Sequence, residues 1–173
     1  DKDKLNELSK VFEKKLNSLE KDCYKLIDEE INLGSPKQVG EILFDKLELS
    51  GGKKTSTGSW STNAEVLENL ANDGHDFPKL LLEWRALSKL KTTYSDALPT
   101  YLNQKTNRIH SSFSMATTST GRLSSSDPNL QNIPIRSEDG RMIRKAFIPE
   151  KGNVLISSDY SQIELRLIAH IAN

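Results

Sequence analysis

The residues best suited to chemistry lie near the end of the chain, where a short apolar run changes into a helical pattern. Residues 154–156 (Val-Leu-Ile) are typical of a buried strand, and the turn signal Lys-Gly-Asn at 151–153 precedes them. From Gln162 onward apolar residues recur at helical spacing, and we expect Ser161 to cap this helix. Asp159 therefore lies between a strand and a helix. A carboxylate there suits a hard cation such as Mg²⁺, and it equally suits a helix cap.

Two long helices are predicted before this junction. Over residues 4–30, apolar side chains recur every three or four positions, at Leu5, Leu8, Phe12, Leu16, Leu19, Cys23 and Leu26. A helix of this length, about 40 Å, must pack against another element. The second helix opens at Asp76-Phe77-Pro78 and carries on one face Leu80, Trp84, Leu87 and Tyr94. We expect the two helices to form an antiparallel pair.

Shorter elements are expected between the long helices. Ser35-Pro36-Lys37-Gln38 is a capping box that predicts a short helix through Val39, Ile42, Leu43 and Leu47. Thr62-x-x-Glu65 predicts the cap of another helix. The low-complexity stretch at 50–61 contains Gly, Ser, Thr and two lysines, so we expect a flexible loop. Such a loop has suitable groups for phosphate contacts, although composition alone favours a solvated linker.

Strands are predicted only in the second part of the chain. After a turn at Thr106-Asn107, a strand is expected from Arg108, with Ile109, Phe113 and Met115 on one face. Asn107 tolerates the positive φ that this turn needs. A strand at 146–148 is expected to pair with residues 154–156. Residues 116–140, which lie between the strand from Arg108 and the strand at 146–148, are too polar to form a core. They predict a long irregular segment, and such segments are usually functional. The predicted fold class is α+β and mostly helical, with long helices followed by part of an antiparallel sheet.

Composition excludes fewer classes of function than the motifs do. The 24 basic residues balance the 24 acidic ones among 173 residues, so net charge gives no sign of nucleic-acid binding. The single cysteine, Cys23, excludes an internal disulfide, fits a reducing cytosol and is expected in the core. No apolar run reaches transmembrane length. Because the chain lacks a starting Met and stops inside a helical pattern, we expect a fragment of a longer protein.

Three stretches together resemble one known family. The string Asp-Tyr-Ser-Gln-Ile-Glu-Leu-Arg at 159–166 resembles the first palm motif of family A DNA polymerases, the bacterial DNA polymerase I type. Residues 120–125 with 127–134 are similar to the primer–template segment of that family, and residues 84–94 to the helix that leads out of its thumb. The resemblance covers nearly the whole chain. It implies a thumb over residues 1–98, with a DNA-gripping tip at about 50–62, and part of a palm over residues 99–173.

The resemblance also implies a nucleotidyl-transfer site. Asp159 is implied to be one of two carboxylates that hold two Mg²⁺ ions, with the backbone carbonyl of Tyr160 as a further ligand. Ser161 and Gln162, at a helix start, are implied to meet the oxygens of a deoxynucleoside triphosphate. Glu164 is implied to fill the space of a ribose 2′-hydroxyl and so to exclude ribonucleotides, which places it with Asp159 among the catalytic residues.

A further set of residues is implied to bind primer–template DNA. Arg122 matches an arginine that reads base-pair geometry in the minor groove. The polar contacts in the same segment are Asp127, Asn129, Gln131, Asn132 and Arg136. In the thumb the implied duplex and phosphate contacts are Asn32, Lys54, Thr55, Ser61, Thr62, Arg85 and Lys89. Gly34 replaces a residue that often carries an amide, which departs from the pattern around Asn32.

The expected function is template-directed DNA synthesis in replication and repair by the parent protein, a monomer of the bacterial cytoplasm with no membrane contact. The family's fingers and its second palm carboxylate would follow Asn173. The chain alone is therefore expected to bind primed DNA weakly and to incorporate no nucleotides. Two alternatives remain at this point: a non-catalytic duplex-DNA-binding module, and a relative of single-subunit RNA polymerases, against which Glu164 argues.

Overall fold

The first apolar stripe folds as one long helix. In the computed structural model, which describes residues 1–172, helix α1 spans Lys2–Ile27. The side chain of Asp1 accepts a hydrogen bond at 2.9 Å from a backbone N–H of the first turn and so caps the helix. Asp28 follows with a left-handed φ of 52° and ends the helix, before the predicted end at Glu30.

The buried face of α1 follows the predicted stripe except at its end. Its buried residues are Leu5, Leu8, Phe12, Cys23 and Ile27. Leu26, which the spacing assigned to this stripe, is 45% exposed. Four residues make slightly more than one helical turn, so Ile27 returns to the face of Cys23 while Leu26 is rotated outward.

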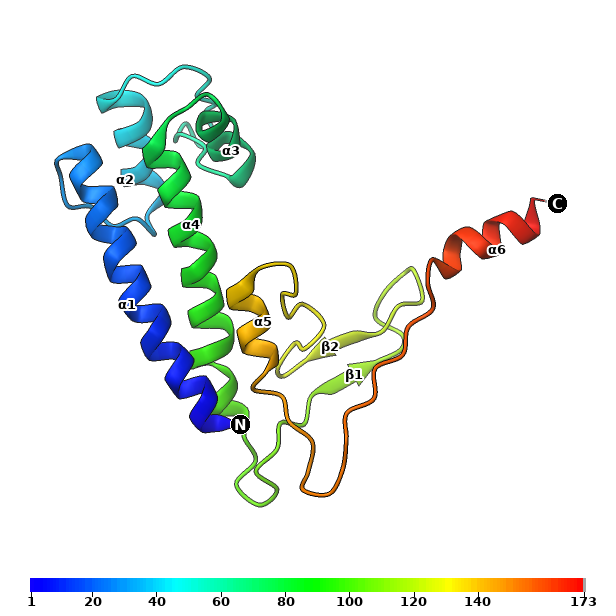
Figure 1. Cartoon of the computed structure of the whole chain (residues 1–173). Helices are drawn as coiled ribbons and strands as arrows, with labels where there is room; N and C mark the ends of the chain where they lie inside the picture. The colour runs from blue at the N-terminus through cyan, green and yellow to red at the C-terminus, as the bar shows by residue number, and fades with distance from the viewer. Residues whose placement is uncertain (173) are drawn as a thin grey trace.

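Helix α4 (Asp76–Leu90) lies beside α1 and runs in the opposite direction (Figure 1). It continues into a π-helical segment, Lys91–Asp96, and a 3-10 turn, Leu98–Tyr101. Its buried residues are Phe77, Pro78, Leu81, Leu87 and Leu90. Leu80 and Trp84, expected on this face, are only partly buried. The predicted antiparallel pair of helices is nevertheless confirmed.

Short helices close the end of the pair that lies far from the N-terminus. Ser35 caps helix α2 (Pro36–Gly40), as predicted, and a π-helical segment, Glu41–Lys46, continues it. Helix α3 (Ala64–Asn72) is capped by Asn63, one residue after the predicted Thr62, because the Asn63 side chain accepts from a backbone N–H of the first turn. Together with the ends of α1 and α4, these helices surround a core that includes Leu33, Leu43, Leu67 and Leu81.

The second part of the chain is smaller and more open. Strands β1 (Ser112–Ser114) and β2 (Ser124–Ser126) form an antiparallel pair in which Phe113 lies opposite Ser125. Helix α5 (Glu138–Arg144) then packs on α1 and α4, where Lys15 forms an ion pair of 2.7 Å with Asp139. The protein is thus mostly helical with a small antiparallel sheet, which confirms the α+β class.

Two predictions for this region need correction. The strand expected from Arg108 is limited to β1, and Phe113 and Met115 are 60% and 82% exposed, so they line no buried face. Residues 116–140 are not irregular throughout, because they contain β2 and the start of α5. The turn before them is as predicted, since Asn107 has a φ of 53°.

The predicted strand pair at 146–148 and 154–156 does not form. The turn at Gly152 is present, because the Asn153 N–H donates to the carbonyl of Glu150 at 2.9 Å, but both flanks are irregular. Val154, Leu155 and Ile156 are 77%, 67% and 88% exposed. A strand requires a partner for its backbone hydrogen bonds, and the described residues bring none to this run.

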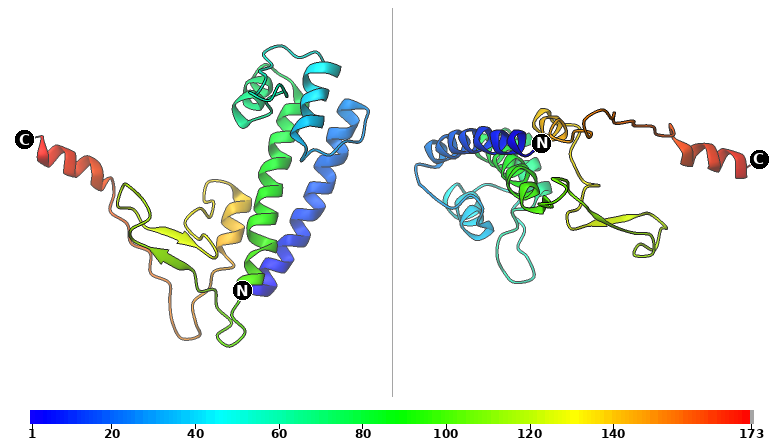
Figure 2. Two further views of the ribbon diagram at one scale, coloured as in Figure 1. Left: turned by 180° about the vertical axis from the view of Figure 1, so that it is seen from behind. Right: turned by 90° about the horizontal axis from the view of Figure 1, so that it is seen from below.

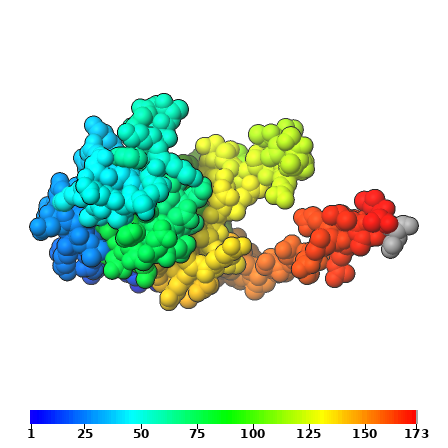
Figure 3. Space-filling view, turned by 90° about the horizontal axis from the view of Figure 1, so that it is seen from above, coloured from blue at the N-terminus to red at the C-terminus, as the bar shows by residue number. Residues whose placement is uncertain are grey.

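Helix α6 (Ile163–Ile171) ends the described chain as a projecting arm (Figures 1 and 2). Its residues are all exposed, and Figure 3 shows it projecting beyond the rest of the molecule. The helix forms where predicted, but Gln162, with φ 51°, occupies the cap position and gives no side-chain bond. Ser161 therefore does not cap it. No helix in the described part of the chain is both long and apolar enough to cross a membrane.

Candidate functional site

The polar segment 127–136 is held against the helices through its main chain. Arg144 of α5 donates from Nη2 to the carbonyl of Ile133 at 2.8 Å and from Nε to that of Pro134 at 3.1 Å. Arg141 donates to the carbonyl of Arg136 at 2.9 Å. Because these bonds use carbonyl oxygens only, they fix the path of the chain and occupy none of the segment's side chains.

Tyr94 adds a further attachment from the helix pair. Its hydroxyl donates a short hydrogen bond to the carbonyl of Asn132. Burial raises the pKa of Tyr94, which favours the protonated hydroxyl that donates this bond. The bond joins the end of the long helices directly to the polar segment.

The start of the polar segment is fixed by the buried side chain of Ser125. Ser125 is 6% exposed, and its hydroxyl accepts from the Leu130 N–H at 3.2 Å and donates to the carbonyl of Pro128 at 3.3 Å. Gln131 reaches across from its side-chain amide to the carbonyl of Leu123 at 2.9 Å. The resulting loop is compact without an apolar core of its own.

The predicted DNA contacts of this segment all lie at the surface of the molecule. All are exposed: Arg122, Asp127, Asn129, Gln131, Asn132 and Arg136. Amide and guanidinium groups on a fixed main chain can donate to phosphate, sugar and base-edge acceptors. The structure therefore leaves each of these sequence-predicted residues open to a partner at the surface.

Arg85 and Thr62, both predicted DNA contacts, are bonded to each other. The Arg85 guanidinium donates to the backbone carbonyl of Thr62 and, at 3.2 Å, to its hydroxyl. Thr62 is 6% exposed, and burial lowers the pKa of Arg85 from its ordinary value. In this structure the pair joins α4 to the start of α3. Lys89, one turn further along α4, is exposed.

The remaining predicted contacts of the first part lie on loops. Lys54 and Thr55 are exposed and Ser61 is partly buried in the 50–61 loop. Asn32 is exposed, and its side-chain oxygen accepts from the Gly34 N–H at 2.9 Å. A side chain at Gly34 would place its Cβ 3.1 Å from that oxygen, so glycine suits this tight turn.

The predicted metal and nucleotide residues lie apart from these contacts, on the C-terminal arm. Asp159, Tyr160, Ser161 and Gln162 are exposed and precede α6, and Glu164 is exposed in its first turn. The carboxylate of Asp159 and the carbonyl of Tyr160 are the oxygen donors that Mg²⁺ takes. Within residues 1–172, no group of three or more His, Cys, Asp or Glu side chains is arranged to hold a metal ion. Asp159 and Tyr160 thus offer oxygen donors of the right kind, but the described residues form no complete metal site.

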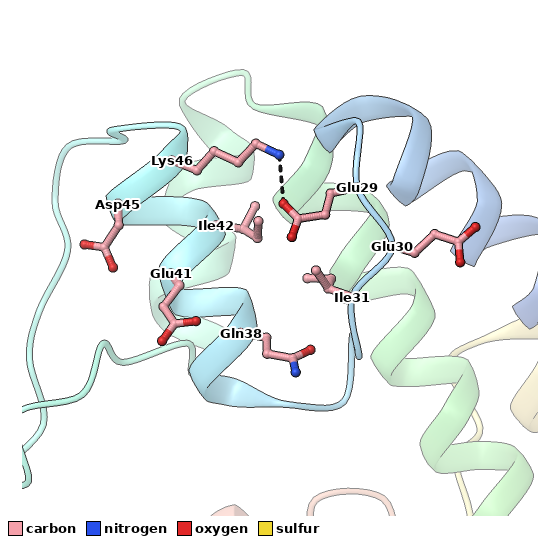
Figure 4. Close-up of a pocket in the computed structure, with 8 residues that line it drawn as sticks. All are labelled: Glu29, Glu30, Ile31, Gln38, Glu41, Ile42, Asp45 and Lys46. Carbon is pink, nitrogen blue, oxygen red and sulfur yellow. Dashed lines mark hydrogen bonds and ion pairs between the residues drawn. The ribbon is translucent and has the colours of Figure 1, made fainter.

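A separate pocket is negatively charged, whereas a surface that binds DNA is usually positive. It has a volume of about 530 Å³ and lies between the end of α1 and the α2 region (Figure 4). Its charged lining residues are Glu29, Glu30, Glu41, Asp45 and Lys46. Lys46 pairs with Glu29 at 2.9 Å, so the carboxylates outnumber the cations and this face repels phosphates.

Sequence reasoning missed the residues that hold the site. The expectations from the sequence include no helix at 138–144 and no role for Arg141 or Arg144, and they place Tyr94 on an apolar face. Their role depends on which distant carbonyl each side chain reaches after folding. No spacing rule in the sequence predicts such a contact.

Comparison with known proteins identifies relatives of this arrangement. The profile of the family described as DNA polymerase family A matches residues 2–173. DNA polymerase I of Rhizobium leguminosarum is 55% identical over 172 residues, which are 99% of this chain and 17% of the relative. DNA polymerase I of Geobacillus stearothermophilus is 48% identical over 173 residues, 99% of this chain and 20% of the relative.

A solved structure agrees with these relatives. The POL domain of Pol1 from M. smegmatis, in complex with DNA primer-template and dNTP, matches with a TM-score of 0.86 and 42% sequence identity. The match covers 99% of this chain and 30% of that chain. The chain thus spans about a fifth of the length of the curated relatives and under a third of the solved domain.

Proposed function

Because the chain belongs to DNA polymerase family A, we propose that it forms the thumb and the first part of the palm of a DNA-directed DNA polymerase. The thumb comprises residues 1–98 and the partial palm residues 99–173. The observation that carries the proposal is the exposed polar segment at 127–136, whose carbonyls are bonded to the helix pair and to α5. This attachment suits a surface that must hold a primer terminus in one position.

Primer–template DNA is the proposed partner of this surface. Arg122 donates to the minor-groove acceptors that every correct base pair presents, so it senses pairing geometry rather than sequence. Asn129, Gln131 and Asn132 donate to the sugar and phosphate groups beside it, and Arg136 neutralises a phosphate. Lys54, Lys89 and Thr55 contact the duplex further from the primer end.

Asp159 and the carbonyl of Tyr160 are the proposed ligands for Mg²⁺. Two such ions, when bound, stabilise the attacking 3′-oxygen and the leaving pyrophosphate of nucleotidyl transfer. The chain's own contribution is to hold one carboxylate at the start of α6. The backbone N–H groups of Ser161 and Gln162 lie at the same helix start, where the helix dipole favours the oxygens of a triphosphate.

Glu164 is the proposed sugar gate. It lies in the first turn of α6, five positions after Asp159 in the sequence, and its side chain is exposed. There it opposes a 2′-hydroxyl on the incoming nucleotide. This role favours a DNA polymerase over an RNA polymerase.

Primer extension by the full-length protein tests the proposal. We expect Asp159→Asn to abolish incorporation, because a neutral amide binds a divalent ion far less well than a carboxylate. Primed-DNA affinity, measured on the same preparations by gel shift, should change little. Incorporation within about tenfold of wild type, which corresponds to about 1.4 kcal/mol of barrier, would contradict the assignment of Asp159.

A further inference from the structure

The loop at 50–61, expected to be flexible, folds back on itself as a hairpin. Lys54 and Trp60 form an antiparallel bridge. The Thr55 N–H donates to the carbonyl of Ser59 at 2.8 Å, and the Ser61 N–H donates to that of Lys53 at 2.8 Å. We call residues 53–61 the tip hairpin. Its two arms are joined by backbone hydrogen bonds, so its shape is partly fixed before any ligand binds.

Trp60 connects the tip hairpin to the helices. Its ring lies 4.8 Å from that of Phe44, centroid to centroid, with planes inclined at 40°. Its indole N–H donates to the Asp45 carboxylate at 3.0 Å. Phe44 and Asp45 both belong to the π-helical segment that follows α2, so one side chain makes an apolar and a polar contact with the same element.

Two glycines leave the space that the indole occupies. A Cβ added at Gly40 would lie 2.6 Å from the Cβ of Trp60. A Cβ added at Gly52 would lie 2.7 Å from a Phe44 ring carbon and 2.9 Å from a Trp60 ring carbon. All three distances are shorter than real carbon contacts, so a larger residue at either position would displace the Trp60 side chain or the Phe44 ring beside it. The chain is thus closely packed around Trp60 from two directions.

The same indole lies beside a cation of the tip. The Lys54 ammonium is 4.9 Å from the Trp60 ring centroid, within the range of a cation–π contact. Lys53 and Lys54 are both exposed, and the tip residues Ser56 and Gly58 are exposed with them. Trp60 therefore contacts the cationic edge of the hairpin on one side and the helices on the other.

We propose that Trp60 is a positioning residue that fixes the tip hairpin on the helices and so presents Lys53 and Lys54, already ordered, to the phosphates of duplex DNA. The inference rests on the proposed function for the existence of a DNA duplex. It adds that the tip is ordered before binding. A loop held in its bound shape loses less conformational freedom on binding, which strengthens the complex without any new contact.

A thermodynamic cycle in the full-length protein tests whether Trp60 acts through the two lysines. The dissociation constant for a primed duplex is measured for Trp60→Ala, for Lys53→Ala with Lys54→Ala, and for the triple variant. We expect Trp60→Ala to weaken binding about tenfold in the wild-type background and less than about twofold where both lysines are absent. Trp60→Phe keeps a ring against Phe44 and should stay within about threefold of wild type.

Trp84 provides a matched control. It is a second partly buried tryptophan packed against the same apolar cluster, but it lies on α4, outside the tip hairpin. Trp84→Ala should change DNA affinity by the same factor with and without the lysines. Melting curves of all variants show that each is folded. If Trp60→Ala binds as tightly as wild type, or loses the same factor in both backgrounds, the positioning role is wrong.

Trypsin gives a readout that needs no DNA. Cleavage after Lys53 or Lys54 requires a locally extended chain, so we expect the native hairpin to resist and Trp60→Ala to be cut about tenfold faster. Trp60→Phe should behave as wild type. Equal cleavage rates for wild type and Trp60→Ala would overturn the proposal. If the wild-type protein fails to bind primed DNA, the proposed function fails, while cleavage still decides whether Trp60 anchors the hairpin.

Discussion

Glu164 offers the sharpest test of substrate choice at the scale of a single residue. Its exposed side chain extends from the first turn of α6, five positions after Asp159 in the sequence. Glu164→Ala removes the side-chain volume that we propose opposes a 2′-hydroxyl. We expect the preference of the full-length enzyme for deoxynucleotides over ribonucleotides to fall by about tenfold or more. Competing incorporation of the two sugars at one template position measures this ratio.

Glu164→Gln is the control for that experiment, because it keeps the volume and removes the charge. It should retain most of the discrimination. Unchanged sugar preference in Glu164→Ala would remove Glu164 from the gate and would revive the RNA polymerase alternative.

Cys23 illustrates a residue whose burial is predicted by its place in the apolar stripe of α1. It is fully buried on α1, and burial, reinforced by the nearby Asp22 carboxylate, raises the pKa of its thiol from 9.0 to about 11. The thiolate is the reactive form, so at pH 8 almost all of the thiol is protonated and inert. We expect a disulfide reagent to label the native protein at pH 8 only as fast as the protein opens, and the urea-unfolded protein within seconds. Rapid native labelling would place Cys23 at the surface.

At the scale of an element, Arg144 tests whether helix α5 holds the polar segment in place for DNA binding. Its Nε and Nη2 donors hold two successive carbonyls of the polar segment, at Ile133 and Pro134. Arg144→Ala loses both bonds, each worth about 0.5–1.5 kcal/mol, and should weaken primed-DNA binding about tenfold. Lysine cannot span both carbonyls, so Arg144→Lys should be intermediate.

The salt dependence of binding separates positioning from phosphate contact. Because Arg144 is bonded to main-chain carbonyls, Arg144→Ala should leave the slope of log affinity against log salt unchanged. Arg136→Ala, which removes a proposed phosphate contact, should reduce the slope by about 0.9. A fall of that size in Arg144→Ala would show that Arg144 itself binds a phosphate.

The elements also show which structure the sequence predicts and which it does not. Helix α1, the Ser35 cap and the positive φ of Asn107 depend on neighbouring residues, and all were predictable. The run at 154–156 has the composition of a strand, but strand pairing depends on a distant partner, which the described residues do not supply. The Trp60 anchor escaped prediction for the same reason, since Phe44 and Asp45 meet it only after folding.

The residues of the candidate site likewise differ in whether their position depends on neighbouring residues or on distant partners. The family resemblance marked the polar segment as a contact surface, and the structure shows that the residues it named there are exposed. The resemblance gave Thr62 and Arg85 a role in DNA binding, but not their bond to each other. Charge and spacing show that a residue is polar, and only the folded chain shows which partner it has already engaged.

At the scale of the whole molecule, the two parts differ in how much apolar surface they bury. The helix pair encloses both apolar clusters of the molecule. Helix α5 and parts of the second region complete the cluster that contains Leu5, Phe12 and Leu90. By contrast, residues 154–156 and the apolar side chains of α6 are exposed. We therefore expect the helix pair of the isolated 173-residue chain to show slow amide hydrogen exchange and the region after Gly152 to exchange rapidly. Slow exchange throughout α6 would contradict this division.

The chain by itself should bind primed DNA without extending it. Lys54, Lys89 and Arg136 are exposed cations, and we expect them to bind phosphates with a strong dependence on salt. Incorporation requires two metal ions held together, and residues 1–172 contain no group of three acidic, histidine or cysteine side chains that could hold them. Purified chain is incubated with labelled primer–template, Mg²⁺ and all four deoxynucleotides, beside a complete polymerase as positive control. Binding by gel shift with no extension is expected, and extension above background in a preparation free of host polymerase would show that this chain contains a complete catalytic site.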